Sequence, residues 1–257
     1  MRNKLRIDLF WIKIAAGAGT VLLVLAWSGI VKDTLLSFVL GFFGSSSILL
    51  FSFALNEAVL HTRSFNKYML RVLILAVICA FPYFILYRDL TSSFRFGDYL
   101  SGPFSVFYGI GCIYVYDKLK VKWMKYASLV ILLLISVFLS VEYAPFCLIY
   151  LFFIHCYSSS EQRKYRDFNI ILFSCAVLLI CGALYLFGPF RSSIDLLKAA
   201  SISGGALGLP LIRNYSGEYQ KSGSRFARYF GKYFFYALYP STIIILAAIK
   251  YFLVTGG

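Results

Sequence analysis

Two ionisable side chains stand four residues apart in an otherwise apolar stretch of the chain. Glu57 and His61 would share one face of a helix, because residues i and i+4 are neighbours there. A carboxylate beside an imidazole can orient the ring and raise its basicity, which is half of a nucleophilic or general-base site. No nucleophile accompanies the pair, but acyl transfer could use the amine or hydroxyl of the acceptor instead. The alternative is an interfacial helix end with ordinary polar residues.

Other polar residues could serve such a reaction. Arg63 and Arg71 are close enough in sequence to hold the phosphates of a donor. Lys232, Tyr236 and Tyr239 share one helical face at positions i, i+4 and i+7, and aromatic side chains of this kind also form interfacial belts. The second histidine, His155, has no acid near it in sequence, and we interpret it as a packing or interfacial residue.

The elements that carry these residues are membrane helices. The chain is 60% hydrophobic and only 14% charged over 257 residues, and apolar runs recur along its whole length. Each run is about long enough to cross a hydrocarbon core, and none shows the strict alternation of a barrel. The sequence therefore predicts an all-α, polytopic membrane bundle in one domain, residues 1–257. About nine spans are expected, at residues 8–31, 35–60, 68–87, 99–116, 126–140, 143–157, 168–187, 196–212 and 233–253.

Basic residues follow the loops in a strict pattern. The N-terminus and every second loop hold eighteen lysines and arginines, whereas the intervening loops hold five. The positive-inside rule then predicts a cytoplasmic N-terminus and an external C-terminus, in the inner (cytoplasmic) membrane. This explanation competes with binding of anionic lipid or nucleotide phosphate by the same clusters. Nucleic acid is not an expected partner, because the charges do not gather on one soluble face.

The cysteines do not indicate a metal site or disulfides. All six fall inside the expected spans, with no C-x-x-C pair and no histidine at ligand spacing. We interpret them as small packing residues, and we expect no metal cofactor.

Two stretches resemble the TraX family of integral membrane proteins. Residues 44–82 contain Glu57, then His61-Thr62-Arg63, and close at Pro82, which is similar to the second and third spans of that family. Residues 207–217 and the later Tyr239-Pro240 are similar to its C-terminal part. The name-giving member acetylates the N-terminus of a conjugative pilin. The resemblance therefore implies acetyl-CoA or another acyl-CoA as donor and a pilin or other envelope protein as acceptor. Glu57 and His61 would be catalytic, Arg63 and Arg71 would bind the donor, and Lys232, Tyr236 and Tyr239 would contact substrate.

The chain departs from the family pattern at four places. Leu23 and Val24 stand where the family has an Asp-His pair, and Ala80 stands where it has an acid. Its Gly-Arg with a downstream Phe-Pro becomes Gly44-Ser45 with Ile48-Leu49, and Ser241-Thr242 replaces the end of a Tyr-Pro-x-His pattern. These replacements favour a second hypothesis, in which the protein is a catalytically degenerate relative. It would then act as a scaffold or accessory subunit of an envelope or pilus assembly.

Overall fold

A computed structural model of the chain describes residues 7–62, 64–87, 101–138, 144–159, 161–187, 194–217 and 225–255. Apart from one isolated bridge between Ile7 and Tyr215, the regular structure of these residues is helical. The helices are α1 Leu9–Trp27, α2 Thr34–Gly44, α3 Ser46–His61, α4 Phe65–Tyr87, α5 Gly102–Lys118, α6 Lys122–Phe138, α7 Ala144–Cys156, α8 Arg163–Phe187, α9 Ile194–Ser201, the 3₁₀ helix η2 Ile202–Gly208, α10 Leu209–Arg213 and α11 Arg225–Thr255. The predicted all-α class is confirmed.

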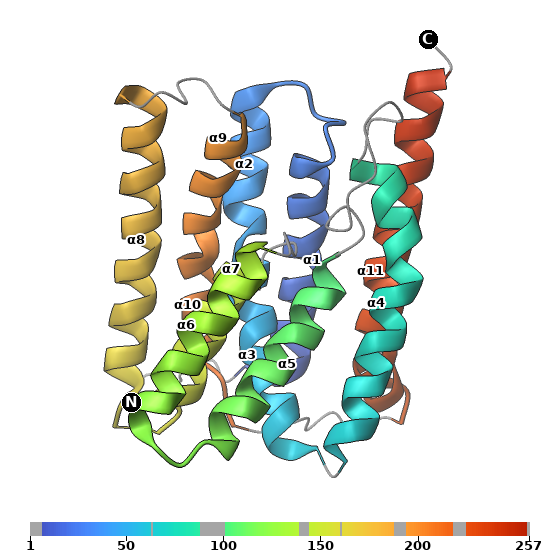
Figure 1. The fold of residues 1–257 in the computed structure, drawn as a ribbon. Coiled ribbons are helices and arrows are strands. Elements are labelled where there is room, and N and C mark those ends of the chain that lie inside the picture. Colours follow the sequence, from blue (N-terminus) through green and yellow to red (C-terminus); the bar gives the residue numbers. More distant parts are fainter. Residues whose placement is uncertain are drawn as a thin grey trace, which may run out of the picture.

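The helices run side by side along one common direction (Figure 1). Five helical stretches are long and apolar enough to cross a membrane: Leu9–Trp27, Thr34–His61, Phe65–Tyr87, Arg163–Phe187 and Tyr236–Leu253. The protein is therefore a multi-pass helical membrane protein. Shorter helices occupy the other four expected spans, so the count of nine and the orientation remain predictions.

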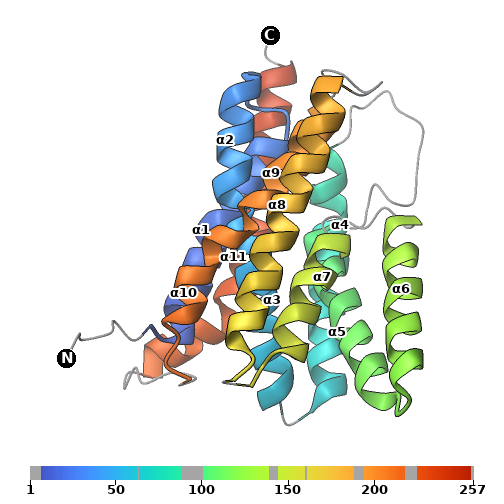
Figure 2. The same cartoon turned by 90° about the vertical axis from the view of Figure 1, so that its left-hand side faces the viewer.

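Three of these shorter helices, α5, α6 and α7, occupy only the lower part of the bundle (Figure 1), and α6 stands at its outer edge (Figure 2). The first turn of α5 lies against α11, where the Gly102 amide donates a hydrogen bond to the Tyr239 hydroxyl oxygen at 3.0 Å. A Cβ on Gly102 would lie 2.8 Å from that oxygen, so glycine permits this contact.

The eighth expected span is a discontinuous helix. It runs as α9, then as the 3₁₀ segment η2, and then as α10. The 3₁₀ segment is buried and packs against the place where α2 passes into α3. A Cβ on Gly204 would lie 1.8 Å from the carbonyl oxygen of Phe42, so only glycine lets the two backbones approach this closely.

A buried tyrosine bonds the irregular backbone of η2. The Tyr150 hydroxyl donates to the carbonyl oxygen of Ile202 at 3.4 Å and lies 3.1 Å from the Ser174 hydroxyl. Irregular backbone at membrane depth is tolerated where protein groups of this kind satisfy it. Side chains of the bundle interior therefore stabilise the break in the eighth span.

Candidate functional site

One end of the bundle collects the polar side chains that could do chemistry. We call it the polar end: it holds the last turns of α3, α5, α7 and α10 and the first turns of α4, α6 and α8, at the bottom of Figure 1. The basic loops of the positive-inside pattern that the structure describes fall at this end. Charged groups gather there because the interior of the bundle and the surrounding lipid penalise them.

Glu57 and His61 lie in the last turns of α3, as the sequence predicts. The Nδ1 atom of His61 is 2.8 Å from the backbone carbonyl oxygen of Glu57 and 3.9 Å from its Oε2 atom. A carbonyl oxygen only accepts hydrogen bonds, so the ring proton of the neutral imidazole belongs on Nδ1 and Nε2 is the basic nitrogen. The His61 side chain is 55% exposed, which makes it accessible from the aqueous side of the polar end.

The Glu57 carboxylate has a partner that the sequence did not indicate. The Tyr215 hydroxyl donates to Glu57 Oε2 at 3.2 Å, and the Tyr215 ring packs edge-on against Phe53 at 5.2 Å between centroids. Tyr215 follows α10 directly. Its segment is fixed to the start of the chain, because the Ile7 amide donates to the Asn214 carbonyl and the Ser216 amide donates to the Ile7 carbonyl.

The remaining predicted site residues are dispersed. Arg63 lies outside the described residues. Arg71 lies on the exposed side of α4, near the polar end. Lys232 belongs to α11, but its side chain is outside the described part, and Tyr236 is half-buried. Tyr239 is buried beside Cys79, Leu86 and Ile243, in a core cluster separate from that of Phe53, and its hydroxyl accepts the Gly102 amide.

His155 is more than the packing residue that the sequence predicts. Its Nε2 atom is 2.9 Å from Asp117 Oδ1 at the end of α5, and its Nδ1 atom is 2.9 Å from Asn56 Oδ1 on α3. Both ring nitrogens therefore face an oxygen atom of a neighbouring side chain. Because both nitrogens are engaged, the ring links α3, α5 and α7, and it is poorly placed to accept a proton from a substrate.

A buried ion network fixes α8 to α10. Arg166 and Asp167 have side chains only 6% and 10% exposed, and Arg166 donates to Asp167 Oδ1 through Nε and Nη2. Arg213 donates to the other carboxylate oxygen at 2.6 Å. Both arginines belong to the basic clusters for which the sequence left topology and anion binding as alternatives. Their ion pairs with Asp167 were not predicted, because the proximity of α10 to α8 does not follow from sequence spacing.

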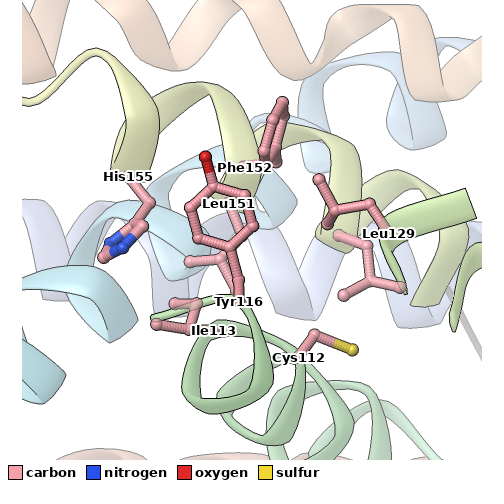
Figure 3. A pocket seen from close by; sticks show the side chains of 8 residues that line it. Cys112, Ile113, Tyr116, Leu129, Leu151, Phe152 and His155 are labelled. Carbon is pink, nitrogen blue, oxygen red and sulfur yellow. The ribbon is translucent and has the colours of Figure 1, made fainter. Parts of the chain in front are cut away.

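A small cavity lies next to His155, between α5, α6 and α7 (Figure 3). Its walls include Ile113 and Tyr116 from α5, Leu129 from α6, and Leu151, Phe152 and His155 from α7. Its volume is about 20 Å³. That is room for about one water, far below the roughly 300–1,000 Å³ of a cofactor pocket. This cavity therefore does not accommodate a coenzyme A molecule.

Among the described residues, no three His, Cys, Asp or Glu side chains are arranged to hold a metal ion. Comparisons of the chain with protein-family models, with curated proteins and with solved structures found no match.

Proposed function

We propose that this protein is a nine-span, TraX-like protein of the cytoplasmic membrane that transfers an acetyl or other acyl group from a coenzyme A donor to a pilin or another envelope protein. The polar end faces the cytoplasm in this proposal, where acyl-CoA is available. The observation that carries it is the geometry of His61: its Nδ1 proton is held by the Glu57 carbonyl, which makes Nε2 the basic atom at an exposed position.

The proposed chemistry uses the acceptor's own nucleophile. Nε2 of His61 removes a proton from an amine or hydroxyl of the acceptor while that group attacks the thioester carbonyl carbon. The carbon–sulfur bond then breaks, and the proton passes from the imidazolium to the departing thiolate of coenzyme A. The carboxylate of Glu57, held by Tyr215, stabilises the imidazolium, and Arg63 and Arg71 bind donor phosphates.

Transfer can be tested with the purified protein in liposomes, with radiolabelled acetyl-CoA and membrane or pilus proteins as acceptors. His61→Gln keeps a polar side chain but removes the base, and we expect it to lower transfer by at least 100-fold, within the usual range for a general base. Glu57→Gln should lower transfer less. Asn66→Ala is a matched control, since Asn66 is an exposed residue of α4 just beyond His61. Equal transfer by His61→Gln and the unmodified protein would refute the assignment.

A second candidate, a non-catalytic scaffold or accessory subunit, is favoured by the surroundings of the replaced family positions. Leu23 and Val24 are 2% and 1% exposed, and Ile48 and Leu49 are also buried. The Thr242 hydroxyl donates only to the carbonyl of Leu238 in its own helix. Packed apolar side chains thus occupy the two positions, Leu23 and Val24, where the resemblance would place an Asp-His pair.

The two candidates predict different results for the same preparation. A scaffold should show no donor turnover and should co-purify with a stable membrane or envelope partner. Turnover of labelled acetyl-CoA that depends on His61 would exclude the scaffold as the sole function.

A further inference from the structure

The turn between α5 and α6 carries more basic residues than any other turn in the described part of the polar end. Lys118, Lys120, Lys122 and Lys125 fall within eight residues, and Asp117 is the only acidic residue between Gly102 and Phe138. Asp117 is already bonded to His155. Nearby carboxylates therefore balance little of the positive charge of the lysines. Arg166 and Arg213 differ in this respect, because both form ion pairs with the carboxylate of Asp167.

Aromatic rings hold two of these lysines beside the apolar surface. Lys125 Nζ lies 4.6 Å from the centroid of the Tyr116 ring, and Lys118 Nζ lies 5.4 Å from that of Tyr114. Trp123 and Tyr126 of α6 are 70% and 60% exposed, as expected for side chains at the boundary between headgroups and hydrocarbon. Exposed aromatic rings beside the lysines therefore favour a position of this turn near the headgroups.

Next to the lysines, the exposed face of α6 offers an apolar surface along which an acyl chain can lie. This face carries Val130, Ile131 and Leu134, which are all more than half exposed. The small cavity of Figure 3 lies on the inner side of α6 and has no room for an acyl chain. Because α6 stands at the edge of the bundle (Figure 2), lipid can approach its exposed face from the side.

We propose that the α5–α6 turn and the exposed apolar face of α6 form a binding site for an anionic phospholipid. The headgroup phosphate binds Lys118, Lys122 and Lys125, and one acyl chain lies along α6. Lysine clusters directly beside a membrane helix attract anionic headgroups, at a strength of about fivefold in affinity for each lysine. The exposed apolar face of α6 beside the charge selects a lipid over a free phosphate. The site does not depend on the proposed acyl transfer.

Native mass spectrometry of the full-length protein in detergent tests this site. Phosphatidylglycerol is added as the probe, with phosphatidylcholine of the same chains and glycerol phosphate as separate arms. The expected result is tight retention of phosphatidylglycerol, weak retention of phosphatidylcholine and no retention of glycerol phosphate. Lys118→Gln, Lys122→Gln and Lys125→Gln together should weaken phosphatidylglycerol binding on the order of 100-fold.

A matched variant removes the same charge elsewhere at the polar end. Lys67→Gln, Arg163→Gln and Lys164→Gln replace three exposed residues, and they should change phosphatidylglycerol binding less than fivefold. Three results would each overturn the proposal: equal loss in the matched variant, equal retention of phosphatidylcholine, or retention of glycerol phosphate alone.

Discussion

Gly204→Ala tests the close approach of η2 to the backbone of α2 at Phe42. The new Cβ would lie 1.8 Å from the carbonyl oxygen and 2.6 Å from the carbonyl carbon of Phe42. Both are backbone atoms, so no side-chain rotation relieves the overlap. Reaching an ordinary separation of about 3.5 Å requires a shift of nearly 2 Å between η2 and α2. Overpacking of this kind costs about 1–3 kcal/mol or more, and we expect about 3 kcal/mol here.

The assay is thermal unfolding of the detergent-purified protein, followed by intrinsic tryptophan fluorescence. A loss of about 3 kcal/mol corresponds to a midpoint lower by roughly 6–12 °C, by the scaling for soluble domains of comparable length. Gly182→Ala in α8 is the matched control, because nothing lies within 4 Å of its added Cβ. It should leave the midpoint unchanged or raise it, as alanine favours helix over glycine. An unchanged midpoint in Gly204→Ala would refute the close approach of η2 to α2.

Three further substitutions test polar contacts of the bundle by the same unfolding assay. Asp167→Asn should lower stability by about 3–5 kcal/mol, because it leaves the buried Arg166 guanidinium without its counter-charge; a midpoint within 2 °C of the unmodified protein would contradict the ion network. His155→Leu should lower stability by about 2 kcal/mol, because it leaves the buried Asn56 amide without this hydrogen bond. Asn56→Leu in that background should recover part of the loss. If the stability losses of the two single variants simply add in the double variant, the bond between His155 and Asn56 is contradicted. Tyr239→Phe removes the acceptor of the Gly102 amide and should cost about 1 kcal/mol, and a gain in stability would contradict that bond.

The class of fold and the positions of the helices could be predicted from the sequence, because hydropathy over a span is a local property. Each of the nine expected spans contains a helix. The proximity of Glu57 and His61 was also predictable from their spacing on one helix. The His61 ring, however, bonds the backbone carbonyl of Glu57, and the carboxylate lies farther away.

Contacts between distant segments could not be predicted from one sequence. Asp117 and His155 are 38 residues apart, and Glu57 and Tyr215 are 158 residues apart. The 3₁₀ break in the eighth span has a sequence signal in Gly204, Gly205 and Gly208, but glycines also occur in regular membrane helices that pack closely. Only the position of Phe42 and Tyr150 beside them explains the break.

Binding of labelled acetyl-CoA to the detergent-purified protein tests the central functional proposal most directly. The measurement includes excess unlabelled competitor, the double variant Arg63→Ala, Arg71→Ala, and Lys67→Ala as a charge-removal control at an exposed position of α4. The account predicts saturable binding that the double variant loses and Lys67→Ala retains. Absence of saturable binding, from protein shown to be folded and monodisperse, would contradict acyl transfer and would favour a scaffold.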